Sequence, residues 1–383
     1  MPEKIRASSP AHLLALLPHL LGYTPRESLL LVPLSKGTTC GVLRIDLPAP
    51  DDVEQVATTA VGHVCRLPEA DALIAAVYTD SPLRDGAGVA YDALALAVSD
   101  RAEACGLRVV DELCVGADGW TPYPSGELRP LSEITRADPY PDRPVARAQN
   151  DGVDVIRADA ADRAPIARHL RTLAQLPHDA FQRHAGGDRA MTSDEALDAE
   201  LAAFDADPRG FFDGAAESSD EASAARAAVW MWALHSPALR DVVFTQWTGG
   251  AEEASRACAW QRRWRAGEAD EPDFPVRLAG EGSRPDSERL RAARTFVRAL
   301  ASRAPDTHLG VCLAVCGWLS WAVGNATHAA EYAARAIDVD PSCTLARLIA
   351  ALTDEGLLPG WAYDPQGTTE SPAREHSSGA AAW

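Results

Sequence analysis

The chain of 383 residues is long enough for two or three domains, and its 46% hydrophobic and 24% charged residues are typical of globular proteins. A formal net charge of -19 repels phosphate backbones and anionic lipids, so we expect neither nucleic acid nor a membrane surface as a partner. No apolar run approaches the roughly 20 residues of a membrane helix, and the first apolar run lacks the features of a signal peptide. These patterns predict a cytoplasmic protein.

The first elements are a helix and a pair of strands. Ser9 and Pro10 are typical of a helix start, and Gly22 of a helix end, so a helix is predicted over residues 9–21. Two short apolar runs follow at 28–34 and 40–47, separated by a turn-forming segment. They predict an antiparallel hairpin.

Alternating helices and strands come next. An Asp-capped helix is expected over 51–66, a strand buried on both faces over 72–78, a helix closed by Gly106 over 89–105, and a strand over 107–115. The order β-β-α-β-α-β predicts an α/β domain with a mixed sheet covered by helices. The polar stretch over 118–126 fits either a small hairpin or a loop.

Proline content and periodicity divide the chain. We expect an α/β domain over 1–134, a Pro-rich connector over 135–159, an all-α domain over 160–362 and a disordered tail over 363–383. Within the all-α domain, helices are predicted over 222–234, 237–247, 252–265 and 286–302, with a linker over 272–285. The acidic stretch over 186–221 indicates a solvated helix and a mobile loop, or a docking surface for a basic partner.

The all-α domain is expected to end in a helical hairpin over 308–341 that resembles a tetratricopeptide repeat. Small residues and a final proline stand at the offsets of that repeat: Gly317, Gly324, Ala329, Ala336 and Pro341. One repeat buries its face only against neighbours, so the pattern supports a helical fold more than peptide binding. Trp318 and Trp321 are interpreted as core residues rather than ligand anchors.

Cysteine and histidine spacing predicts no metal site. The eight cysteines lie mostly in apolar runs and form no CxxC, which is typical of free thiols buried in a core. Cys312 and Cys316 are one helical turn apart but have no further ligands within the pattern. The ten histidines also lack metal-binding spacing, and no cofactor is predicted.

The sequence contains none of the common phosphate-binding or hydrolase motifs, so the catalytic residues stay unknown. Gly86 and Gly88 lie between a predicted strand and a predicted helix and are the best candidates for an anion-binding loop. Two glycines also occur in ordinary loops, so that alternative stays open. Arg44, Asp46 and Asp80 are expected near the carboxyl edge of the sheet, where ligands collect in α/β folds. Arg44 and Asp46 share a face of one strand and could instead form a simple salt bridge.

Two groups of residues, one near each end of the chain, form a recognisable sequence motif: Pro18, Gly22, Tyr23, Pro25 and Ser28, then Trp318, Gly324 and Pro341. Together they resemble the actinobacterial DUF4192 family over about residues 5–361. The preference for Arg over Lys agrees with the GC-rich genomes of that group. The resemblance implies no activity, because the family is named for lacking an assigned function.

Two functions remain open at this point. The first is a non-catalytic protein-interaction or scaffolding module, indicated by the helical hairpin, the acidic stretch and the missing catalytic motifs. The second is a small-molecule or nucleotide-binding enzyme with a cleft at the carboxyl edge of the N-terminal sheet. We prefer the first, with another protein as the partner.

Overall fold

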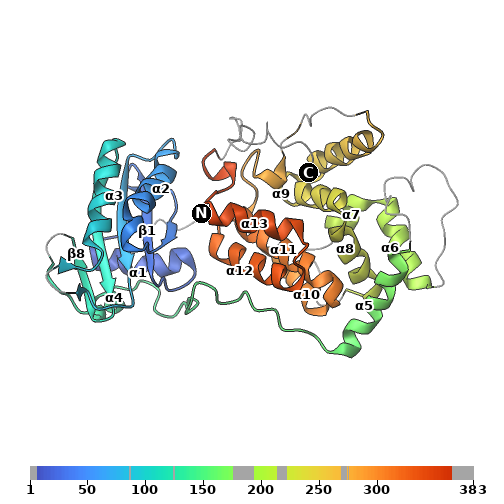
Figure 1. Ribbon diagram of the computed structural model, residues 1–383, viewed down its shortest axis with the longest axis horizontal. Coiled ribbons are helices and arrows are strands. Elements are labelled where there is room, and N and C mark those ends of the chain that lie inside the picture. The colour runs from blue at the N-terminus through green and yellow to red at the C-terminus, as the bar shows by residue number, and fades with distance from the viewer. Residues whose placement is uncertain are drawn as a thin grey trace. The chain divides into compact units, whose positions relative to one another are not determined.

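The computed structural model describes residues 7–85, 88–123, 126–175, 194–213, 222–268, 274 and 276–364. The chain forms two compact units, Met1–Asp151 and Gly152–Trp383. The first is a mixed α/β unit and the second is helical, as expected (Figure 1). The predicted tail over 363–383 lies almost wholly outside the described residues.

The α/β unit contains one mixed sheet. Its strands are β1 (Ser28–Ser35), β2 (Thr38–Thr39), β3 (Leu43–Asp46), β4 (Ala72–Tyr78), β7 (Arg108–Gly116) and β8 (Gly119–Pro122). Strand β1 pairs antiparallel with β2, β3 and β4, β4 pairs parallel with β7, and β7 pairs antiparallel with β8. The predicted hairpin is confirmed, with its second strand interrupted at residues 40–42, and the polar stretch after β7 forms a hairpin through β8.

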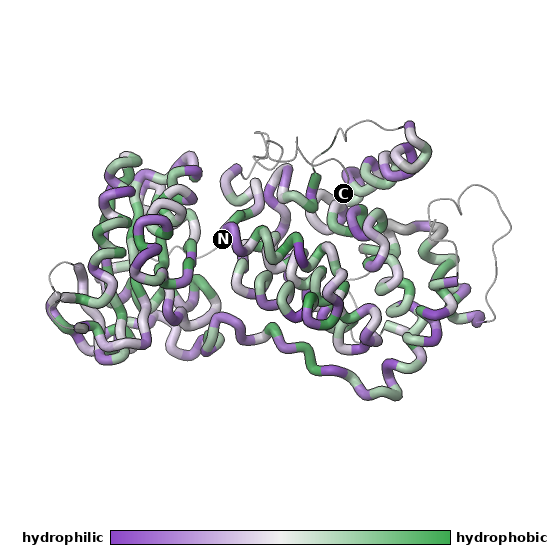
Figure 2. The backbone as a smooth tube through the Cα atoms, viewed as in Figure 1, coloured by the Kyte–Doolittle hydropathy of each residue, from purple (hydrophilic) through white to green (hydrophobic). Residues whose placement is uncertain are grey.

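Strand β4 is buried along its whole length because helices cover both faces of the sheet. Alternate residues point to opposite faces: Leu73, Ala75 and Val77 join one apolar core, and Ile74 and Ala76 join the other. The helices α2 (Val53–Cys65) and α3 (Asp92–Ala104) cover the first face, and α1 (Pro10–Leu21) and α4 (Leu131–Arg136) the second. Hydrophobic residues follow the central strands (Figure 2).

The ends of the helices in the α/β unit show which capping signals in the sequence correctly predicted a helix boundary. Ser9 accepts a hydrogen bond from the backbone N–H of His12, and Gly22 ends α1 at φ +83°, as predicted. The predicted Asp cap of α2 is wrong, because Asp52 makes no capping bond and belongs to a short 3-10 turn before the helix. Helix α3 starts at Asp92 rather than Val89, since Gly88–Val89 (β6) pairs with Arg84–Asp85 (β5).

The second unit is built from helices around one large apolar core: α5 (Ala160–Leu173), α6 (Glu195–Ala206), α7 (Pro208–Asp213), α8 (Ala224–His235), α9 (Pro237–Arg265), α10 (Ser287–Arg303), α11 (Asp306–Ala322), α12 (Ala326–Val339) and α13 (Thr344–Asp354). The predicted helices from residue 222 onward are confirmed. Helix α9 is broken at Gly250, whose φ of +86° is not helical, so its two parts match the two predicted helices. No helix in the described part of the chain is long and apolar enough to cross a membrane.

Helices α11 and α12 form the predicted hairpin. Gly324 adopts φ +84° between them, and the Asn325 side chain accepts a hydrogen bond from the backbone N–H of His328 at 3.1 Å. A Cβ at Gly317 would lie 3.3 Å from the carbonyl oxygen of Ala329, so a small residue permits the close approach of the two helices. The likeness to a tetratricopeptide repeat stays a prediction. Pro341 follows the end of α12, and Trp318 and Trp321 are core residues, as interpreted.

Two further interpretations need correction, and a third concerns a stretch that is described in part only. Cys40, Cys65 and Cys105 are exposed rather than buried. The stretch over 272–285 is not a free linker where it is described, because the side chains of Arg277 and Glu281 are buried. The acidic stretch is described in part only: α6 buries Asp198 together with its apolar residues, and 176–193 and 214–221 lie outside the described residues.

Candidate functional site

The carboxyl ends of three strands meet at one edge of the sheet. Strands β3 and β4 both pair antiparallel with β1 and therefore run in the same direction, and β7 is parallel to β4. The register places Ser28, the first residue of β1, opposite both Asp46 and Tyr78. The start of β1 therefore lies at the edge where the other three strands end. This is the edge at which open α/β sheets bind ligands.

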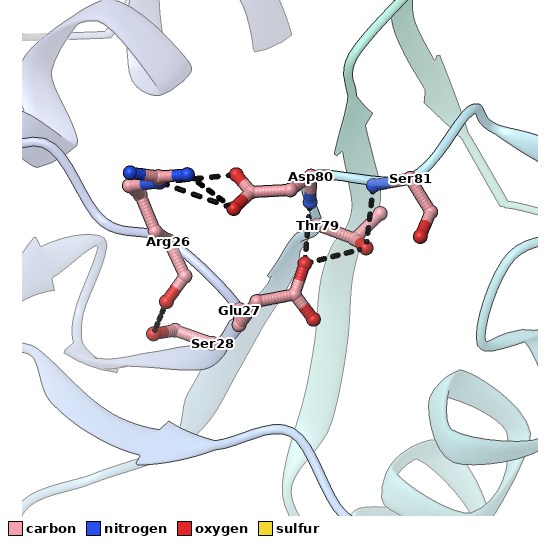
Figure 3. Close-up of polar contacts among 6 residues, drawn as sticks. All are labelled: Arg26, Glu27, Ser28, Thr79, Asp80 and Ser81. Carbon is pink, nitrogen blue, oxygen red and sulfur yellow. Dashed lines mark hydrogen bonds and ion pairs between the residues drawn. The ribbon is translucent and has the colours of Figure 1, made fainter.

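Arg26 and Asp80 form an exposed bidentate pair at this edge (Figure 3). The Arg26 Nε–H donates to Asp80 Oδ1 at 3.1 Å, and its Nη2 donates to Asp80 Oδ2. These hydrogen bonds lower the pKa of Asp80 and raise the pKa of Arg26. The two side chains remain 60% and 50% exposed, so both can reach a molecule in solution.

Glu27 connects the start of β1 to the end of β4 (Figure 3). Its Oε1 accepts hydrogen bonds from the Thr79 hydroxyl at 3.0 Å and from the backbone N–H of Asp80. The Thr79 hydroxyl in turn accepts from the backbone N–H of Ser81 at 3.2 Å. Glu27 holds φ +42°, a left-handed conformation that costs a non-glycine residue free energy. Such strain persists only where surrounding contacts impose it, and it occurs often at binding sites.

Arg44 and Asp46 join the same network from β3. The Arg44 Nη2 pairs with the Asp46 carboxylate, and its Nε–H donates to the Ser28 hydroxyl at 2.8 Å. Ser28 is fully buried and donates to the carbonyl oxygen of Arg26 at 2.6 Å. The Arg44 side chain is 9% exposed and Asp46 78%, so Arg44 supports the edge and Asp46 faces solvent. The predicted salt bridge exists, and Ser28 links it to the Arg26–Asp80 pair. We call the five charged residues Arg26, Glu27, Arg44, Asp46 and Asp80 the edge cluster.

Only one of the two glycines proposed as an anion-binding loop can be placed. Gly86 is outside the described residues, and Gly88 belongs to the small β5–β6 hairpin. A Cβ at Gly88 would lie 2.9 Å from Asp92 Oδ2, and Asp92 Oδ1 accepts from the backbone N–H of Ala93 at 2.8 Å. A carboxylate therefore stands at the start of α3, where the anion would bind. This geometry argues against an anion site at Gly88.

The N-terminal pattern residues shape the loop that carries the edge cluster. Pro18 accepts the backbone hydrogen bond that closes α1 at Gly22, and Gly22 then accepts one from Ala146 at 3.0 Å. Tyr23 and Pro25 are buried, and Ser28 begins β1. Together these residues fix the segment from which Arg26 and Glu27 project. Arg26, Glu27 and Thr79 were not predicted as site residues. The sequence signal that could have identified Arg26 and Glu27 is a charged pair directly before a buried strand, and Thr79 directly follows the buried strand β4.

No metal site is evident where the structure is described: no three His, Cys, Asp or Glu side chains are grouped so as to hold an ion. The fold and the edge cluster together define the class of this protein: it has two units and carries a polar site at one edge of an α/β sheet. The family model described as a domain of unknown function, DUF4192, matches residues 10–272. The chain therefore belongs to the DUF4192 family. Trp318, Gly324 and Pro341 lie beyond the matched residues. No curated protein and no solved structure matches the chain.

Proposed function

We propose that the α/β unit binds a small polar ligand at the edge cluster. The observation that carries the proposal is Glu27, a strained non-glycine residue held by Thr79 and Asp80 at the carboxyl edge of the sheet. Its contacts fix the backbone on which Arg26 and Asp80 are presented to solvent. A site held in place before binding loses less conformational entropy when a ligand arrives.

Charge defines the class of ligand. The edge cluster combines two guanidinium groups, Arg26 and Arg44, with three carboxylates, Glu27, Asp46 and Asp80. Arg44 is only 9% exposed, whereas Asp46 and Asp80 are 78% and 50% exposed, so carboxylates outnumber guanidinium groups at the surface of the cluster. This balance favours a ligand that presents amino or hydroxyl donors and disfavours a phosphate. It supports a small amine, such as an amino acid or a diamine, over the nucleotide considered from the sequence.

The test is a thermal-shift and calorimetric screen of the full chain against small amines and nucleotides. We expect an amine to bind, and Asp80→Asn to weaken that binding about tenfold to a hundredfold, because a charge-assisted hydrogen bond contributes about 1.5–3 kcal/mol. Arg26→Gln should also weaken binding, since it releases Asp80 from its fixed position.

Arg101→Gln is the matched control. Arg101 forms an exposed ion pair with Glu54 at 2.9 Å between α3 and α2, so this variant also removes one surface pair. Binding by this variant should equal that of the unaltered protein. Binding of a nucleotide in preference to every amine, or an amine affinity untouched by Asp80→Asn, would contradict the proposal.

Protein interaction is a second candidate function, and the observation that favours it is the surface of the second part of α9. Trp264 is 56% exposed there, with its ring stacked on Trp260 at 5.2 Å between centroids. Four arginines and no acidic residue occur over 256–265 in a chain of net charge -19. Exposed tryptophan beside arginine is typical of protein-binding surfaces. Charge complementarity supports an acidic segment of another protein as the partner.

A titration with defined peptides tests this second candidate. The full chain should bind an acidic peptide more weakly as salt rises, and Trp264→Ala and Arg262→Glu should each weaken binding about tenfold or more. Arg335→Gln, which removes the ion pair between Arg335 of α12 and Asp154, should bind as the unaltered protein does. Preference for single-stranded nucleic acid over the peptide, or equal binding by Trp264→Ala, would contradict the candidate.

A further inference from the structure

Two exposed cysteines end neighbouring helices of the α/β unit. Cys65 is the last residue of α2, and Cys105 directly follows α3. Both helices pack on the same face of the sheet and against each other (Figure 1). The strands that follow them, β4 and β7, are parallel, and their first residues, Ala72 and Arg108, lie opposite each other. The two helices therefore end at the same edge of the sheet, opposite to that of the edge cluster.

Cys105 lies close enough to Cys65 to affect the ionisation of its thiol. The pKa of Cys65 is raised to about 11, first by desolvation and then by a hydrogen bond with Cys105 and by the charge of Cys105. Both residues are exposed, whereas Cys114, Cys312, Cys316 and Cys343 are buried. The pair is thus open to a reagent in solution, and the packing of α2 against α3 makes the two cysteines neighbours at one edge of the sheet. Neither feature belongs to the proposed ligand site.

We propose that Cys65 and Cys105 form a reversible disulfide by exchange with a low-molecular-weight disulfide. One thiolate of the pair attacks a sulfur of the small disulfide, which forms a mixed disulfide and releases one small thiol. The other thiolate of the pair attacks the protein sulfur of that mixed disulfide and releases the second small thiol. The two cysteines lose two electrons and two protons, and the small disulfide gains both and leaves as two thiols.

The chemistry of the pair predicts how it reacts. Only the thiolate is nucleophilic, and the raised pKa of Cys65 keeps that group protonated at neutral pH, so attack by Cys65 should be slow at pH 7 and faster at alkaline pH. The disulfide joins the ends of α2 and α3 and encloses β4, a central strand. It should raise the melting temperature, because it restricts the unfolded chain between the two cysteines.

The test is oxidation of the full chain by oxidised glutathione, followed by tryptic digestion without reductant and mass spectrometry. We expect the tryptic peptides 45–66 and 102–108, which contain Cys65 and Cys105 respectively, to be recovered as one linked species that dithiothreitol separates. The melting temperature of the oxidised protein should rise by several degrees and return to its starting value on reduction.

Single variants separate a disulfide from unrelated thiol chemistry. Cys65→Ser and Cys105→Ser should each abolish the linked peptides and the rise in melting temperature, and leave a glutathione adduct on the remaining cysteine. Cys40→Ser, which removes a different exposed thiol, should retain both effects. Separate glutathione adducts on Cys65 and Cys105 of the unaltered protein, or no reaction at either cysteine, would overturn the proposal.

Discussion

Replacing Trp318 with alanine should lower the free energy of unfolding of the helical unit by about 4 kcal/mol, the range found for large aromatic side chains in cores. Trp318 lies on α11 and is fully buried. Its ring stacks on Phe244 at 3.8 Å between centroids, with 4° between the planes. Its Nε1–H donates to the carbonyl oxygen of Leu278 at 3.1 Å. Alanine would leave both a cavity and an unpaired carbonyl, measurable by urea denaturation.

Two other variants show which part of this loss comes from packing. Trp318→Phe retains an aromatic ring but no donor, so it should cost about 1–3 kcal/mol, mostly from the unpaired Leu278 carbonyl. Trp264→Ala removes an exposed tryptophan and should change stability by about 0.5 kcal/mol or less. Unfolding of Trp318→Ala at nearly the same urea concentration as Trp264→Ala would show that Trp318 does not stabilise the core of the helical unit.

Arg277 is the second residue whose replacement should be costly. Its guanidinium is almost completely buried and binds both carboxylate oxygens of Glu253, at 2.6 and 2.8 Å. It also donates to the carbonyl oxygens of Glu281 and Ser283. Arg277→Met should lower the free energy of unfolding by about 3 kcal/mol, since removing one partner leaves the Glu253 charge poorly compensated. Urea denaturation again measures the loss.

Matched variants test that explanation. Glu253→Gln retains an acceptor for Arg277 and should cost less than Arg277→Met. Arg335→Gln removes the ion pairs of a half-buried arginine with Asp154 and Glu331 near the surface and should cost about 0.5 kcal/mol or less, because surface ion pairs contribute little. An Arg277→Met protein as stable as Arg335→Gln would show that the pair does not hold this segment to α9.

Local patterns were sufficient for most of the fold. Strand β4 was predictable because seven consecutive apolar residues suit a strand covered on both faces, and α1 because Ser9 and Gly22 act on neighbouring backbone groups. The start of α3 was misplaced because pairing of β6 with β5 takes residues that the helical period would include. Pairing between segments overrides local preference there.

The candidate site was predictable in part. Arg44, Asp46 and Asp80 were expected at the carboxyl edge because that edge follows from the order of strands and helices. Arg26 and Glu27 were missed because their position depends on β1 running antiparallel between β3 and β4. The left-handed conformation of Glu27 has no signal in sequence, since it arises from contacts with Thr79 and Asp80.

The class of each unit, the order of the elements and the main helix boundaries follow from local sequence patterns, because periodicity and capping act over a few residues. Tertiary structure determines which distant groups meet. It brought Cys65 to Cys105 and buried Arg277 in a stretch rich in proline and glycine. Gly280 has a similar role there, as a Cβ at this position would lie 2.8 Å from the Trp321 ring. Burial and pairing depend on packing between segments far apart in the chain, which local composition does not encode.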